Sequence, residues 1–146
     1  MTFEDKFTEK QKDMISIALE YVERINVHVN NLYIYCSHEN NMYTFDLFFG
    51  EEKKIYLIHQ LSLDSDPSLM IQVLQIGNQD LQEIHEICKK YDRPMPTQIK
   101  IIYDNVNKKV HADYSYELFY SNSDTLTSND IFNQWFEEVK AEVEGK

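Results

Sequence analysis

Three runs of alternating apolar and polar residues follow one another between positions 32 and 60, joined by links of only a few polar residues. The runs are Leu32–Cys36, Tyr43–Phe49 and Lys54–Gln60, and the links contain HENN and GEEK. Alternation with a period of two is typical of a strand with one buried face. Short polar turns join strands that run antiparallel. This stretch therefore predicts a three-stranded antiparallel meander.

Helical periodicity takes over on both sides of the meander. Residues from about Phe3 to Ile25 place their apolar side chains on one stripe, and residues from Leu69 to about Tyr91 do the same. Gly77-Asn78 interrupts the second segment, so one kinked helix and two short helices both fit the pattern. Before it, Leu61–Ser68 is a predicted loop whose last three residues suit the start of a helix.

The C-terminal third returns to the strand pattern and ends in a helix. Asp92–Thr97 (DRPMPT) breaks the chain because proline cannot continue a helix, and Gln98–Tyr103 and Lys108–Glu117 are two more predicted strands. A polar turn follows, with Thr127 or Ser128 as the N-cap and Asp130 near the positive end of the helix dipole. The last helix carries five apolar side chains at helical spacing: Ile131, Phe132, Trp135, Phe136 and Val139.

The expected element order is α-β-β-β-α-β-β-α. Of the 146 residues, 42% are hydrophobic and 13% aromatic, which is enough for one hydrophobic core. We expect a single domain over residues 1–146, of the α+β class, in which one antiparallel sheet of about five strands has helices packed against it.

The charge balance restricts the possible partners. The formal net charge is −11, which repels phosphate backbones and anionic lipids and attracts cationic proteins. We therefore expect neither nucleic acid nor a membrane as partner. No apolar run is long enough to span a bilayer, and the N-terminus is charged where a signal peptide would be apolar. Cys36 and Cys88 are best explained as reduced core residues, so we expect a cytoplasmic protein.

The sequence offers little for catalysis. Its five histidines form no known metal motif, the His85 and Cys88 pair is a weak metal signal, and no glycine-rich phosphate loop occurs. We expect no metal and no cofactor. An acid–base couple of His59 and His111, both on predicted strands, would imitate a ribonuclease, but a basic cradle for phosphate is missing.

A binding surface is the stronger hypothesis. Carboxylates complement a surface rich in arginine and lysine, and aromatic side chains supply contact area at low entropic cost. The final strand, turn and helix start carry both kinds of side chain, and we predict as partner-binding residues Asp113, Glu117, Phe119, Tyr120, Asp124 and Asp130. Tyr114 and Tyr116 share the apolar face of their strand, so we assign them, like Trp135, to the core.

Three features of the sequence stand out together with the element order: Pro96-Thr97, the strand Asp113-Tyr114-Ser115-Tyr116-Glu117 and a final helix that contains Trp135. In these features the chain resembles the YezG-like family of bacterial immunity proteins. One departure is Met95-Pro96, which stands where an aromatic residue is expected before the threonine.

The resemblance implies a binding role without catalytic residues. Members of the YezG-like family bind a cognate toxin domain, commonly a nuclease delivered to competing cells, and hold it inactive in the producing cell. An acidic protein suits this role because a nuclease surface is basic. We therefore expect an antitoxin that occludes a basic toxin domain. The alternatives are a small hydrolase that uses a His–carboxylate pair and a generic secretion adaptor; the oligomeric state stays open.

Overall fold

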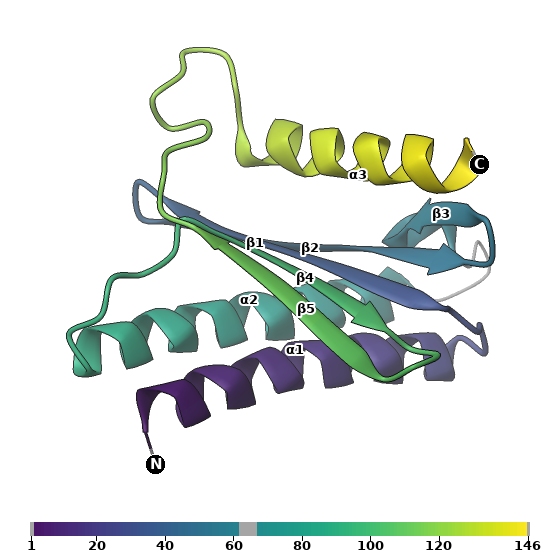
Figure 1. The fold of residues 1–146 in the computed structure, drawn as a ribbon, viewed down its shortest axis with the longest axis horizontal. Helices are drawn as coiled ribbons and strands as arrows, with labels where there is room; N and C mark the ends of the chain where they lie inside the picture. The colour runs from purple at the N-terminus through teal and green to yellow at the C-terminus, as the bar shows by residue number, and fades with distance from the viewer. Residues whose placement is uncertain (1, 62–66, 146) are drawn as a thin grey trace.

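The computed structural model describes residues 2–61 and 67–145. The chain contains three helices and five strands within these ranges. Their order along the chain is the predicted one, α-β-β-β-α-β-β-α (Figure 1). The elements are α1 (Phe3–Arg24), β1 (Asn31–Glu39), β2 (Met42–Glu51), β3 (Lys54–Leu57), the 3-10 turn η1 (Ile58–Gln60), α2 (Pro67–Lys90), β4 (Gln98–Asp104), β5 (Lys109–Ser115) and α3 (Ser128–Glu144). The predicted α+β class is confirmed.

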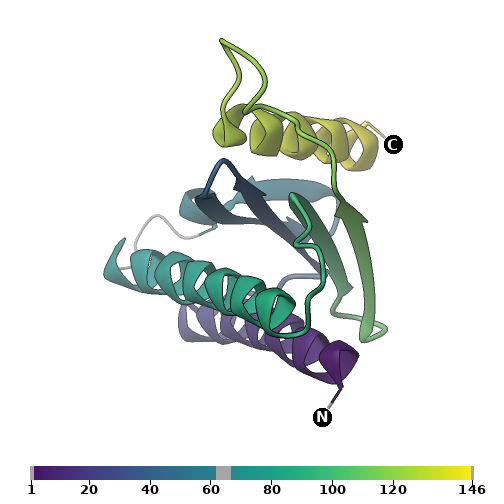
Figure 2. The same ribbon diagram turned by 90° about the vertical axis from the view of Figure 1, so that its left-hand side faces the viewer.

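The five strands form one antiparallel sheet in the order β3-β2-β1-β4-β5. Helices α1 and α2 lie side by side against one face, and α3 lies against the other (Figures 1 and 2). Helix α3 contacts β3 and β2, so it covers only part of its face. The sheet therefore has a well-covered side and a side that is partly open next to β4 and β5.

Each face of the sheet has its own hydrophobic cluster. On the α1/α2 side, Leu32, Ile34 and Leu47 are fully buried. On the α3 side, Tyr33, Tyr35 and Phe48 pack against a cluster from α3 that comprises Ile131, Phe132, Trp135 and Phe136. Trp135 is 6% exposed, so its assignment to the core is confirmed. Successive residues of β1 thus serve opposite layers, which makes β1 the central strand.

Two local predictions need correction. The strand predicted over Lys54–Gln60 ends at Leu57, because Gln60 bonds the Leu57 N–H through its side chain and the chain turns into η1. The strand predicted to reach Glu117 ends at Ser115. Of the predicted loop Leu61–Ser68, residues 62–66 lie outside the described residues. Pro67 and Ser68 begin α2, as their helix-start pattern predicted.

Packing decides whether the second helical segment is one helix or two. Helix α2 is continuous through Gly77, which is buried against the ring of Phe45. A Cβ at this position would lie 2.1 Å from the ring, which is too close. The glycine is therefore a site of close helix–sheet contact. None of the helices in the described ranges is both long and apolar enough to cross a bilayer.

Candidate functional site

The negative charge of the protein is concentrated in its last quarter. Residues 111–145 contain eight carboxylates and one lysine, Lys140, which gives −7 of the total charge of −11. Among the described residues, this segment forms two ion pairs: His111 with Asp113, and Lys140 with Glu144. Most of its carboxylates therefore face solvent without a basic partner.

Helix α3 presents the densest part of this charge. Its apolar side packs on the sheet, so that Glu137, Glu138 and Glu142 are exposed on its outer side. Asp124, in the loop before α3, is exposed too. The sequence prediction did not include the three glutamates, because adjacent carboxylates are ordinary on a solvated helix face. The charge balance of residues 111–145 was the signal that could have found them.

The six predicted site residues divide into exposed and structural groups. Asp113, Glu117 and Asp124 are exposed. Asp130 is half-buried and caps α3, with its carboxylate accepting from the Thr127 backbone N–H at 2.8 Å. Thr127 is thus the N-cap, as one of the two predicted alternatives had it.

The prediction that Tyr120 is a surface anchor is wrong. Tyr120 is 6% exposed, and its hydroxyl is hydrogen-bonded to that of Ser37 at 2.5 Å. Phe119 is half-buried against the α3-side cluster. The reason is that the chain leaves the sheet after Ser115 and folds over the end of β1, where both rings are covered.

Glu39 holds this crossing in place. Its carboxylate accepts hydrogen bonds from the backbone N–H groups of Phe119 (2.9 Å), Tyr120 (3.4 Å) and Ser121 (3.1 Å) and from the Ser121 hydroxyl (2.8 Å). Burial by itself would raise the pKa of Glu39, but these hydrogen bonds outweigh burial and leave the pKa lowered. A buried carboxylate thereby fixes the connection between β5 and α3.

Two of the segments that carry the family resemblance meet at this connection. The Thr97 hydroxyl donates to the backbone carbonyls of Ser115 (3.1 Å) and Glu117 (2.6 Å). The proline–threonine break is thus fastened to the end of the Asp113–Glu117 segment. Trp135 lies in the core, with the Lys100 ammonium 5.2 Å from its ring centroid. Thr97 thus holds the end of β5, and Trp135 packs α3 against the sheet.

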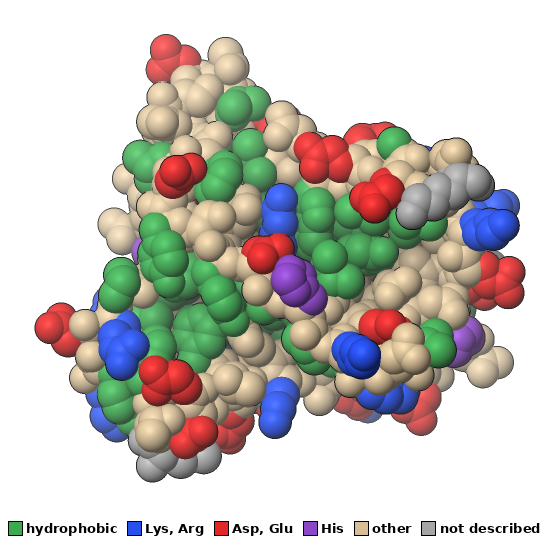
Figure 3. All heavy atoms as spheres, in the orientation of Figure 1, with side chains coloured by type: hydrophobic (Ala, Val, Ile, Leu, Met, Phe, Trp, Pro, Cys, Tyr) green, Lys and Arg blue, Asp and Glu red, His purple; other side chains and the backbone are tan. Residues whose placement is uncertain are grey.

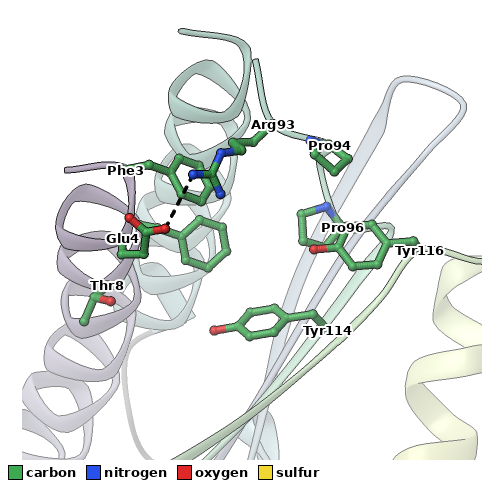
Figure 4. Close-up of a pocket in the computed structure, with 9 residues that line it drawn as sticks. Phe3, Glu4, Thr8, Arg93, Pro94, Pro96, Tyr114 and Tyr116 are labelled. Carbon is green, nitrogen blue, oxygen red and sulfur yellow. Dashed lines mark ion pairs between the residues drawn. The ribbon is translucent and has the colours of Figure 1, made fainter. Parts of the chain in front are cut away.

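An aromatic pocket lies on the other side of β5. The pocket has a volume of about 330 Å³. Apolar side chains also gather at the molecular surface around the start of α1 (Figure 3). Arg93 closes one end through its ion pair with Glu4 at 3.6 Å (Figure 4). The remaining lining residues are Phe3, Phe7, Thr8, Pro94, Pro96, Tyr114 and Tyr116.

The assignment of Tyr114 and Tyr116 to the core is corrected by this pocket. Their side chains are 42% and 57% exposed, and both extend toward α1 (Figure 4). Tyr114 makes an edge contact with Phe7 and accepts a hydrogen bond from Gln11 at 2.6 Å. Strand β5 is the last of the sheet and α1 covers it incompletely, so its apolar parity does not bury these rings.

The histidines do not form the predicted couple. His59 follows β3 and His111 lies on β5, at opposite edges of the sheet. Four inter-strand spacings of about 4.8 Å each separate β3 from β5, so the two rings cannot act on one atom. The predicted acid–base couple of these two histidines is therefore absent.

A different histidine cluster joins α2 to the β1–β2 hairpin. The His85 ring nitrogen Nδ1 is hydrogen-bonded to the Tyr43 hydroxyl at 2.5 Å, and the rings of His38 and His85 lie 4.4 Å apart. Burial lowers the pKa of both imidazoles, and the charge of Lys89 adds to the effect. Cys88 is buried and directs its sulfur to Met95. Within the described residues, no group of three or more metal-binding side chains occurs.

Comparison with known proteins gives no assignment: no protein-family model matches the chain, and no curated protein is significantly similar to it.

Proposed function

We propose that this chain is a cytoplasmic immunity protein that binds one basic toxin domain, a nuclease in the leading form of the proposal, and occludes its active site or substrate groove. The observation that carries the proposal is the charge of residues 111–145, which is −7 and mostly unpaired. The protein acts by binding and not by catalysis.

The physical basis is electrostatic complementarity. A nuclease holds phosphates with lysine and arginine side chains, and a surface of ordered carboxylates presents the same charge to them. Long-range attraction also speeds the encounter, so the antitoxin captures its target before damage begins. Binding of this kind weakens as salt screens the charges.

The proposed contact surface combines residues from the final strand, loop and helix. Its carboxylates are Asp113, Glu117, Asp124, Glu137, Glu138 and Glu142, all of them exposed. Tyr116 and Leu118, 57% and 52% exposed, supply the apolar contacts in place of Tyr120. Phe119 and Asp130 position the surface, because one packs beneath it and the other caps its helix.

The toxin part of the proposal rests on the resemblance to YezG-like immunity proteins. The quoted residues Pro96-Thr97, Asp113–Glu117 and Trp135 support it. They do so as structural elements, since Thr97 and Trp135 hold the strand and helix that present the charge.

The test has two stages. The tagged protein is used to isolate a partner from its native host at low and high salt, and the partner is then produced alone to measure its toxicity. Co-expression of this chain should restore growth. The purified pair should then show association that slows as salt rises.

A matched pair of variants locates the surface. Glu137→Lys with Glu138→Lys reverses two exposed charges on α3, while Glu9→Lys with Glu23→Lys makes the same change in net charge on exposed positions of α1. The α3 variant should slow association at least about tenfold more than the α1 variant. Equal effects would remove the α3 surface from the proposal. Several unrelated partners that are lost at moderate salt, without toxicity, would favour an adaptor instead.

A further inference from the structure

The outer edge of β5 is the most open backbone in the sheet. Strand β5 has seven residues and, among the strands in the described ranges, pairs only with β4. Within the described chain, the backbone of β5 accepts a side-chain hydrogen bond from Thr97 at the Ser115 carbonyl. Thr97 lies on the β4 side of the strand, so this bond does not cover the outer edge. An edge strand of this length presents N–H and C=O groups that another strand can satisfy.

Exposed apolar side chains gather at the same edge. Nine large hydrophobic residues of the described chain are exposed, and five of them lie within positions 106–118. They are Val106, Val110, Tyr114, Tyr116 and Leu118. Soluble proteins rarely leave such a group uncovered next to an unpaired strand. The edge thus combines free backbone groups with a surface that gains from burial.

The charges along this strand are segregated. Lys108 and Lys109 stand at its start, while Asp113 and Glu117 stand at and beyond its end. An antiparallel copy of the same strand brings the basic start of one chain to the acidic end of the other. A lysine- or arginine-rich strand would instead meet the two lysines. Charge complementarity along the edge therefore selects a second copy of this chain.

We infer that two copies of the protein pair through β5 in a twofold-symmetric dimer, which joins their sheets into one continuous antiparallel sheet. The register that overlaps all seven residues of each strand centres on Ala112. It sets His111 opposite the partner's Asp113 and Val110 opposite the partner's Tyr114. Because the twofold axis repeats every contact, each complementary pair occurs twice.

The side chains of the pairs are exposed, and the His111–Asp113 contact within each chain, at 3.2 Å, is exchanged for the same contact between chains. His111 and Asp113 are 69% and 68% exposed and share the face of the sheet toward α3. Val110 is 53% exposed and Tyr114 42%, and they share the opposite face. Lys109 lies diagonal to the partner's Asp113, within reach of a long side chain. The pairs across the edge are thus Val110 with Tyr114, Ala112 with itself, His111 with Asp113, and Lys109 with Ser115, and none of them sets two like charges opposite each other.

The net charge sets the strength and the salt dependence. Two chains of −11 repel each other, and a single strand pairing buries little area, so we expect a weak dimer that dissociates on dilution. Added salt screens the repulsion and strengthens the dimer. The proposed toxin complex responds to salt in the opposite direction, so the two associations can be told apart. The dimer does not depend on the proposed function, but both use Asp113, Tyr116 and Leu118, so the dimer and the toxin complex compete for this edge.

Sedimentation velocity of the full chain over a micromolar concentration series tests this inference. The weight-average mass should rise from 17.5 kDa toward twice that value, and more readily at higher salt. His111→Asp places two aspartates opposite each other at two sites and should weaken dimerisation about tenfold. Adding Asp113→His to that variant restores opposite partners in every pair and should restore the dimer.

The controls separate this register from general effects. His28→Asp adds the same charge at an exposed position away from the edge and should leave the dimer unchanged. Thermal unfolding of each variant, compared at low concentration, checks that the fold is retained. A chain that stays monomeric at every concentration and salt overturns the inference. So does a double variant that fails to recover, or a His28→Asp variant that dissociates as strongly.

Discussion

The two edges of the sheet are treated in opposite ways. Strand β3 has four residues, and side chains bond two of its N–H groups: Glu144 accepts from Ile55 at 2.9 Å, and Gln60 accepts from Leu57 at 2.8 Å. Strand β5 has seven residues, and two of its apolar side chains, Val110 and Tyr114, are largely exposed. One edge is closed by the chain itself and the other is available.

The position of α3 explains this difference. The helix lies over β3 and β2, so its apolar side buries Ile55 and its last turn delivers Glu144 to the β3 backbone. No helix of the described ranges covers β5 in this way, because the connection from β5 crosses the end of β1, where the Glu39 carboxylate binds it. The same helix therefore closes one edge, leaves the other open and carries the acidic surface.

The largest expected effect is at the closed edge. Ile55→Ala removes a side chain that is 2% exposed and should cost about 2–5 kcal/mol of unfolding free energy. Val110→Ala, the matched change at the open edge, should stay within about 0.5 kcal/mol when unfolding is measured at low protein concentration. Urea unfolding of both variants gives the comparison directly. Similar losses would show that β5 is as well packed as β3.

Glu39→Gln should have the next largest effect. It weakens four hydrogen bonds to a charged acceptor and should cost about 1.5–3 kcal/mol at neutral pH. Because the pKa of Glu39 is lowered on folding, its contribution is complete above the ordinary glutamate pKa of about 4.3 and is lost as pH falls toward the folded value. The difference between native protein and variant should therefore shrink below about pH 4.

The control for Glu39 is Glu117→Gln, which alters an exposed carboxylate near the same connection. Its unfolding free energy should not change measurably. An equal loss in both variants would mean that charge in this region matters, rather than the four hydrogen bonds.

Tyr114→Phe should have a smaller effect, because it removes one hydroxyl that links β5 to α1 through Gln11. We expect a loss of about 0.5–1.5 kcal/mol in chemical unfolding. For Tyr116→Phe we expect no change, since the described residues provide no hydrogen bond to that hydroxyl. A neutral Tyr114→Phe variant would mean that the edge is not anchored by this contact.

Glu144→Ala should have the smallest effect on stability and a clear effect on exchange. The carboxylate is solvent-accessible and also pairs with Lys140, so its loss lowers stability only slightly. The amide of Ile55 should nonetheless exchange faster by hydrogen-exchange mass spectrometry or NMR. Glu142→Ala removes a nearby charge and should leave this rate unchanged. Unaltered exchange in Glu144→Ala would show that the β3 edge is closed by another contact.

The local features of the fold could be predicted from the sequence. Alternation fixed the strands and helical spacing fixed the three helices, because both patterns are properties of neighbouring residues. The capping box of Thr127 and Asp130 is equally local, since its two residues lie within one turn. The order of elements and the single antiparallel sheet followed from these patterns and the short turns.

The site could be predicted only in part. Asp113, Glu117 and Asp124 are exposed, as a contact role requires, whereas Tyr120 is buried and Tyr116 is exposed. Both tyrosines differ from the prediction, because alternation of buried and exposed side chains applies only while the chain stays in the sheet. After Ser115 the direction of a side chain depends on where the connection is held, and Glu39, some eighty positions earlier, holds it.

The sequence by itself thus determined the elements, their order and the concentration of acid in the last quarter of the chain. The tertiary structure decided which strand lies at which edge, and with it the separation of His59 from His111 and the exposure of Tyr114. The physical reason is that periodicity records whether a residue has a buried side. Strand order and helix placement are set by contacts between distant segments, which no local pattern encodes.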